Sequence, residues 1–160
     1  MLKSALLLIL VSFFKFASPI EWKIDGVVEC KENIHGLGEF SFLLQEATVN
    51  FWERDWPDPD DHKDGPALTD SFGHFHVEGH EFETFSVEPY LEIDHQCYTP
   101  TSKQPLLNGC YYRTLVELDQ NKKTDNRQKV HIILGMESAR LISEKGKDLL
   151  IKTEVKCPDK

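Results

Sequence analysis

The feature that most constrains this chain is a repeated alternation of apolar and polar residues in short runs. In HFHVE at 74–78, Phe75 and Val77 alternate with His74, His76 and Glu78. Further runs of this kind are ATVNFWER, EPYLEIDHQC, YYRTLVEL, KVHIIL and DLLIKTEVKC. This period of two is typical of strands that bury one face. Because turn residues separate the runs, the sequence predicts an all-β fold, with a β-sandwich as the leading architecture.

One segment departs from this pattern, since MESARLISEK at 136–145 has helical spacing. We therefore expect at most one short helix. The 160 residues, 40% of them apolar, can bury one core but hardly two. We expect a single domain over residues 19–160.

Residues 1–18 have the three parts of a secretory signal peptide. Lys3 precedes an apolar run at 5–14, and small residues follow at Ala17 and Ser18. The run is too short to cross ~30 Å of hydrocarbon, and Lys15 interrupts it. We predict cleavage near residues 17–21, secretion to the extracellular space, and no transmembrane segment after the signal is removed.

The formal charge is −9, and loss of Lys3 and Lys15 with the leader makes it −11. This acidic balance argues against nucleic acid as a partner, because nucleic acid binds a basic face. It also argues against simple electrostatic binding to anionic lipid.

Four cysteines, an even number in a chain predicted to be exported, indicate two disulfides. Three pairings are possible. Strand parity puts Cys30 on the apolar face of 22–30 and Cys157 on the apolar face of 149–157, so both sulfurs should point inward. Cys97 and Cys110 flank a short, turn-rich segment. We therefore predict the pairs Cys30–Cys157 and Cys97–Cys110.

The polar run WERDWPDPDDHKDG at 52–65 imitates the opening of an EF-hand calcium loop through Asp60, Asp64 and Gly65. The twelfth position of such a loop would be Ser71 rather than the required glutamate. We predict a solvated loop between two strands, and weak calcium binding stays open.

His74, His76 and His80 are the candidates for a metal site, since a two-residue spacing places them on one face of a strand. Phe75 and Val77 occupy the opposite face. Alternation alone explains an outward polar face. We therefore predict a structural strand and no metal or other cofactor, with zinc binding through these histidines as the alternative.

Several of these segments together resemble a known family. The succession TDSFGHFHVEG, then EPYLEIDHQC, preceded by GVVEC, is similar to the transthyretin-like family of small secreted proteins, best known from nematodes. The matching positions are Thr69, Asp70, Gly73, Phe75, Gly79, Pro89, Tyr90, Leu91, Ile93, His95 and Cys97. The resemblance covers roughly residues 25–118 and implies a transthyretin-type sandwich of about seven or eight strands. Residues 119–150 depart from the family pattern, so strand order there stays open.

Parity places His95 on the inward face beside Cys97, which predicts a partly buried histidine, hydrogen-bonded near the disulfide. Phe51 shares the parity of Val49 and is predicted to lie in the core. The aromatic residues predicted to contact a ligand are Trp52, Trp56 and Tyr90.

The family resemblance implies an extracellular binding or bridging protein that recognises a protein, a lipid or a small apolar ligand, in extracellular fluid or at a cell surface. A homodimer stays open. The alternative is a hydrolase, because a related branch of the fold hydrolyses 5-hydroxyisourate with histidines, an arginine and a C-terminal Tyr-Arg-Gly-Ser. This chain ends in KCPDK, so we expect no enzyme activity.

Overall fold

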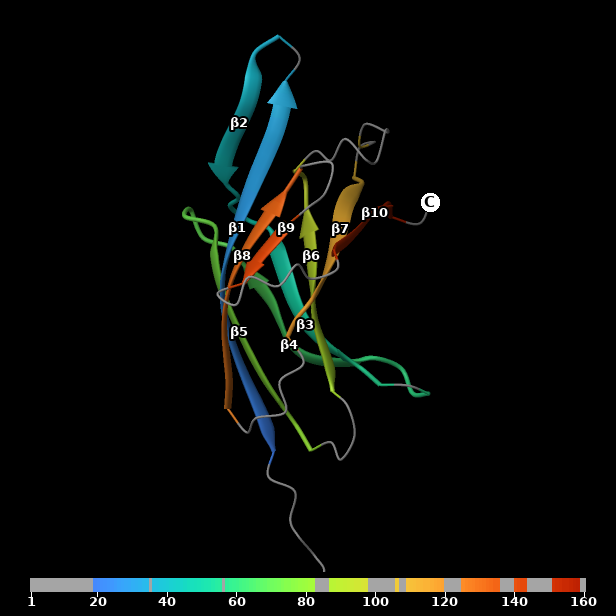
Figure 1. Cartoon of the computed structure of the whole chain (residues 1–160). Coiled ribbons are helices and arrows are strands. Elements are labelled where there is room, and N and C mark those ends of the chain that lie inside the picture. The colour runs from blue at the N-terminus through green and yellow to red at the C-terminus, as the bar shows by residue number, and fades with distance from the viewer. Residues whose placement is uncertain are drawn as a thin grey trace, which may run out of the picture.

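The computed structural model describes residues 19–34, 36–55, 57–82, 87–97, 106, 109–119, 125–135, 140–143 and 151–158. Their regular secondary structure consists of strands only, joined by turns and irregular segments (Figure 1). The strands are β1 Ile20–Ile34, β2 Gly38–Leu43, β3 Thr48–Arg54, β4 Asp61–Leu68, β5 His74–Glu81, β6 Glu88–His95, β7 Tyr111–Glu117, β8 Asp125–Leu134, β9 Arg140–Ser143 and β10 Ile151–Lys156. The all-β prediction is confirmed, with ten described strands instead of seven or eight. The predicted signal peptide lies outside the described residues, and within them no helix could cross a membrane.

The strands form two five-stranded sheets that pack as a sandwich. Sheet B has the order β10-β7-β6-β3-β4, and sheet A has the order β2-β1-β8-β9 with β5 also paired to β1. The long strand β1 organises sheet A (Figure 1). Its residues 20–27 pair with β5 and 29–34 pair with β2, while β8 runs parallel to 21–30 on its other edge. Three segments far apart in the sequence thus meet on one strand.

The core lies between the sheets and follows the predicted alternation. Trp22 of β1 and Phe51 of β3 are 1% and 0% exposed. Their rings pack edge to face across the sandwich, with centroids 6.1 Å apart. Ile24 and Val28 are also buried. Burial of such a side chain contributes about 1.5–3 kcal/mol to stability. The inward set predicted for β1 and the core position of Phe51 are confirmed.

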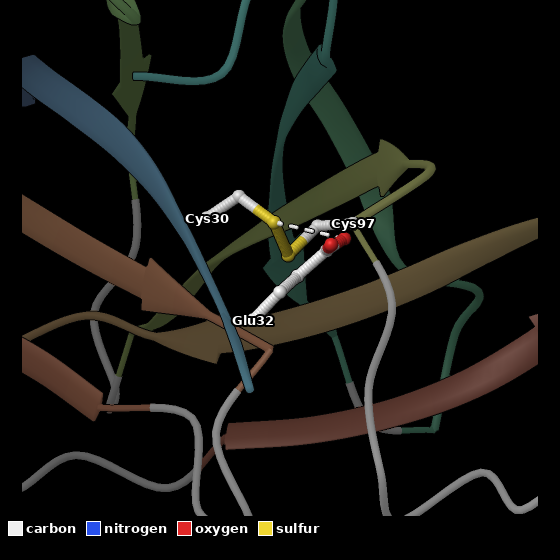
Figure 2. Close-up of side chains that lie close together, drawn as sticks. All are labelled: Cys30, Glu32 and Cys97. Carbon is white, nitrogen blue, oxygen red and sulfur yellow. Dashed lines mark hydrogen bonds between the residues drawn. A yellow bond between two sulfur atoms is a disulfide. The ribbon is translucent and has the colours of Figure 1, made fainter. Parts of the chain in front are cut away.

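The disulfide pairing predicted from parity was wrong. The structure joins Cys30 to Cys97 and Cys110 to Cys157. Cys30 lies in β1 of sheet A and Cys97 follows β6 of sheet B, so this buried bridge ties the two sheets together (Figure 2). All four cysteines form disulfides, as expected.

The second bridge follows from strand register. In the antiparallel pair of β7 with β10, Tyr111 lies opposite Lys156, so the next positions outward are Cys110 and Cys157. Cys157 is exposed at this sheet margin, whereas we predicted that it points inward. Parity alone could not show that β10 lies beside β7.

The predicted helix at 136–145 was also wrong where the structure describes it. Arg140–Ser143 forms β9, antiparallel to residues 130–133 of β8. Pairing with the exposed edge of β8 gives these residues inter-strand hydrogen bonds, which outweigh a weak helical pattern. The rest of that segment lies outside the described residues.

The predicted loop at 52–65 is largely strand. β3 continues to Arg54, and β4 begins at Asp61 and pairs with β3 through an irregular register. Gly65 has φ +107°, and a β-carbon there would stand 2.7 Å from the carbonyl oxygen of Val49. The extended backbone of β4 is not that of an EF-hand loop.

Candidate ligand-binding site

The histidine strand β5 has the orientation that alternation predicts. His74, His76 and His80 are exposed, while Phe75 and Val77 are 6% and 0% exposed. The imidazoles do not converge: among the described residues, Cys30, Glu32 and Cys97 form the one group of three potential ligands within 4.8 Å of one another. The geometry therefore gives the zinc alternative no support.

That group is not an open metal site in this structure either. Figure 2 shows Glu32 lying beside the Cys30–Cys97 disulfide, with Oε1 3.8 Å from the Cys30 sulfur. A thiolate is needed to bind a metal ion, and both sulfurs are joined to each other. The cluster is a structural bridge with an adjacent carboxylate.

A hollow of about 630 Å³ lies where β4, β5, β1 and β8 come together. We call it the sheet A hollow, and its lining is more apolar than polar. The lining residues are Asp25, Gly26, Val27, Ala67, Leu68, His74, Phe75, His76, Lys129 and Val130. Apolar hollows with a few polar groups are the usual form of small-molecule sites.

Strand register explains why these residues meet. In one row across sheet A, His76 lies opposite Asp25, and Asp25 lies opposite Lys129. The next row begins with His74 and Val27. The sheet thus presents one row made of His76, Asp25 and Lys129, and beside it a second row in which the β1 residue is the apolar Val27.

Two exposed apolar side chains extend the hollow. Leu68 and Phe72 are each 62% exposed, and we call them the rim. Leu68 lines the hollow directly, and the Phe72 ring lies 6.3 Å from the ring of His74, which also lines it. Large exposed apolar groups beside a hollow are typical of interaction sites rather than of ordinary surface.

The turn at 69–73 fixes the rim in place. Thr69, 3% exposed, donates its hydroxyl to the Leu44 carbonyl at 2.6 Å and accepts the Ala47 amide at 2.9 Å. Asp70 Oδ1 accepts the amides of Phe72 and His74 at 2.8 and 2.9 Å. These bonds to its charged form lower the pKa of Asp70. The Thr-Asp pair of the family pattern therefore has a structural task, which is to aim Phe72.

The charges around the hollow are unevenly paired. Asp25 Oδ1 lies 2.8 Å from His76 Nδ1. Lys129, which is exposed, makes no ion pair with any residue that the structure describes. An apolar hollow with an exposed ammonium at its margin can hold an apolar molecule and donate a hydrogen bond to a polar group at one end of that molecule.

The aromatic residues predicted as ligand contacts lie elsewhere. Trp52 and Tyr90 are opposite each other on β3 and β6 of sheet B, and Trp56 lies outside the described residues. Tyr90 is 7% exposed; its hydroxyl donates to Asp60 at 2.8 Å, and burial followed by this bond raises its pKa. Trp52 is half-buried, with its ring 4.8 Å from that of His62. Their contact role stays a prediction, and their burial gives it no support.

His95 lies inside, as predicted, at 4% exposed beside Cys97. Its Nε2 lies 2.8 Å from Thr114 Oγ1. Burial lowers the pKa of His95 to about 4, so the imidazole is neutral at physiological pH. This histidine belongs to the core and not to the hollow.

The residues that sequence reasoning missed are Val27, Leu68, Phe72 and Lys129. Of these four residues, only Phe72 stands out in the sequence. It lies in the turn SFG at 71–73, and turns favour glycine, proline, asparagine, aspartate and serine over aromatic residues. Val27, Leu68 and Lys129 carry no local signal, since they meet only through the pairing of distant strands.

Comparison with known proteins agrees with this architecture. A family model described as the transthyretin-like family (TTR-52) matches residues 41–119. Transthyretin-like protein 16 of Caenorhabditis elegans is 44% identical over 74 residues, which cover 46% of this chain and 48% of that protein, so the match spans about half the length of this relative. No solved structure gives a match. Residues 41–119, which include the turn that aims Phe72 and the strands β3 to β7, thus belong to the transthyretin-like family, as the resemblance in the sequence predicted.

Proposed function

We propose that this protein is an extracellular binding protein that holds a small apolar ligand in the sheet A hollow. The observation that carries the proposal is the joint exposure of Leu68 and Phe72, 62% each, beside a hollow of about 630 Å³. Exposing these groups to water is unfavourable unless a ligand or partner covers them.

Two disulfides support the extracellular location. Such bonds form and persist in oxidising compartments and are rare in the cytosol. The leader-like sequence of residues 1–18 supports the same compartment.

Binding rather than catalysis is also the better account of the buried histidine. His95 and Thr114 have the spacing of a base and a hydroxyl nucleophile, with Nε2 and Oγ1 2.8 Å apart. Thr114 is 0% exposed, however, so no substrate can reach its hydroxyl. Turnover of 5-hydroxyisourate by the purified protein, followed by absorbance, would contradict this part of the proposal.

Titration with the neutral apolar dye Nile red tests the hollow, with a panel of apolar compounds as competitors. We expect saturable fluorescence enhancement by the native protein and its loss in Phe72→Ser and Leu68→Ser. Phe82→Ser is the matched control, because Phe82 is 64% exposed but does not line the hollow. Equal dye binding by all four proteins, or none by the native protein, would refute the proposal.

A further inference from the structure

Cys30, Glu32 and Cys97 lie together where β1 of sheet A meets the end of β6 of sheet B (Figure 2). Cys30 and Glu32 are two positions apart on β1, so their side chains leave the strand on the same face. Two sulfurs and a carboxylate oxygen thus come within 4.8 Å of one another. Cysteine sulfur and carboxylate oxygen are both ligands that Zn²⁺ accepts in proteins.

The disulfide alone does not explain the position of this carboxylate. Glu32 Oε1 lies 3.8 Å from the Cys30 sulfur, but a sulfur within a disulfide has no proton to donate. The contact therefore brings no hydrogen bond to the oxidised protein. In a chain with free thiols, a carboxylate would oppose formation of thiolates at Cys30 and Cys97 unless a cation joined the three groups. A divalent cation would use all of them at once.

The surroundings of the cluster favour a bound cation. Cys30 and Cys97 are 0% and 2% exposed, whereas Glu32 is half-buried, so an ion can approach from the side of its carboxylate. Phe42 and Phe40 lie opposite Cys30 and Glu32 in the register of β2 with β1. Apolar neighbours lower the local dielectric constant and strengthen the attraction between a cation and its anionic ligands.

An oxygen of the backbone also lies close to the cluster. A β-carbon on Gly135, directly after β8, would collide with the Lys31 carbonyl oxygen and stand 3.0 Å from the Cys97 sulfur. The glycine therefore lets this carbonyl group and this sulfur approach one another. A water molecule or the carbonyl oxygen can fill the fourth position of a tetrahedral site that has three side-chain ligands.

We infer that the chain with free thiols binds one Zn²⁺ through Cys30, Cys97 and Glu32, before the disulfide forms. Each thiol releases its proton on binding, so two thiolates and one carboxylate hold the ion. Zn²⁺ has no redox chemistry of its own and leaves the thiols unoxidised. While the ion is bound, Cys30 and Cys97 stay together and are protected from pairing with Cys110 or Cys157.

Closure of the bridge then releases the ion. One protein thiolate attacks a small disulfide of the glutathione class and expels its first thiolate, and the second protein thiolate attacks the mixed disulfide and expels the other. Two electrons thus pass to the small disulfide, the bond between Cys30 and Cys97 forms, and Zn²⁺ returns to water. This inference concerns the maturation of the sandwich and does not depend on the sheet A hollow.

Titration of the reduced protein with Co²⁺ tests the site, because Co²⁺ replaces Zn²⁺ and absorbs in the near ultraviolet when thiolates bind it. The variant Cys110→Ser/Cys157→Ser, reduced with a phosphine, limits the thiols to two. We expect one equivalent of Co²⁺ to bind, Zn²⁺ to displace it, and the oxidised form of this variant to bind none. No thiolate absorption, or equal absorption after Cys30 and Cys97 are also replaced by serine, would overturn the inference.

Glu32→Gln distinguishes a three-ligand site from two thiols that bind metal by themselves. Made in the same variant, this change keeps the shape of the side chain and removes its charge, so Zn²⁺ binding should weaken at least roughly tenfold. Glu39→Gln is the matched control, because Glu39 pairs with Lys31 and does not belong to the cluster. An equal affinity of these two variants for Zn²⁺ would exclude Glu32 as a ligand and refute the site.

Near-ultraviolet circular dichroism and urea unfolding show whether the metal acts on the fold. If the reduced variant is unfolded without metal, Zn²⁺ should restore the native spectrum, because metal binding then contributes to folding. If the variant is already folded, Zn²⁺ should raise its urea midpoint, and should raise it less in Glu32→Gln. A reduced variant in which Zn²⁺ changes neither the spectrum nor the midpoint would contradict the inference.

Discussion

The ring of Phe75 lies against the bare backbone of Gly26. A β-carbon on Gly26 would stand 2.2 Å from two carbons of that ring and 2.9 Å from a methyl group of Val130. Phe75 is on β5, Gly26 on β1 and Val130 on β8, and all three line the sheet A hollow. The absence of one side chain thus allows three strands to close beneath the proposed site.

Replacing this glycine tests that relationship. Gly26→Ala should lower the free energy of unfolding by about 1–3 kcal/mol, because the new methyl group overpacks a filled site. Urea denaturation measures the loss. The double variant Gly26→Ala/Phe75→Leu should recover part of it, since a smaller side chain makes room. Additive losses would show that the contact is not the cause.

The disulfide pairing gives a direct chemical test. Proteolysis of the non-reduced protein should release one peptide pair containing Cys30 and Cys97 and another containing Cys110 and Cys157, identified by mass spectrometry. A fragment joining Cys97 to Cys110 would contradict the structure.

The two bridges should also differ in their contribution to stability. Their sequence separations are 67 and 47, for which loop entropy alone predicts about 4 kcal/mol each. Cys30 and Cys97 are buried, however, so Cys30→Ala/Cys97→Ala also leaves a cavity between the sheets. We expect this variant to have the lower urea midpoint of the two. A lower midpoint for Cys110→Ala/Cys157→Ala would contradict the prediction.

The buried His95 should make the fold sensitive to acid. Its pKa is about 4 in the folded protein and 6.5 when unfolded, so between these values the unfolded chain binds the proton more tightly. Stability from this group is present above pH 6.5 and is lost as the pH falls toward 4, by about 3 kcal/mol in all.

Urea unfolding at pH 7 and pH 4.5 measures this loss. His95→Gln removes the titrating group, so its stability should fall less between the two pH values than that of the native protein. Carboxylates titrate in both proteins, and their contribution cancels in the comparison. An identical pH dependence would show that His95 is not buried in its neutral form.

Thr69 should be essential for the turn that aims Phe72. Thr69→Val leaves the partly buried Leu44 carbonyl and the buried Ala47 amide without the hydroxyl, at a cost of about 2–4 kcal/mol. Thr69→Ser keeps the hydroxyl and should retain most of the stability. In folded Thr69→Val, dye binding should weaken together with stability. Equal stability of the Val and Ser variants would show that the Thr69 hydroxyl does not stabilise the turn.

Much of the local arrangement could be predicted from the sequence. Alternation placed Trp22, Ile24 and Val28 of β1 inside and His74 and His76 of β5 outside. This is possible because the side chains of a strand alternate strictly, whatever lies beside it. The resemblance to the transthyretin-like family could be predicted from the sequence of the turn and strand that begin at Thr69.

Parity could not show which strands are neighbours. It placed Cys30 inward correctly, but it could not show which of the three other cysteines lies close to Cys30. In the folded sandwich Cys97, just after β6, has its Cα 5.7 Å from that of Cys30. Parity also could not show that Trp52 and Tyr90 are covered by other side chains. Tyr90 donates its hydroxyl to Asp60, and the ring of Trp52 packs against that of His62.

The sequence by itself thus determined the strands, the face that each residue occupies and the family, since these depend on neighbouring residues and backbone geometry. Only the tertiary structure decided the disulfide partners, the sheet A hollow and the cluster of Cys30, Glu32 and Cys97. Each of these arises where strands distant in the sequence pair or pack together, and that arrangement depends on the packing of the whole sandwich rather than on any local pattern.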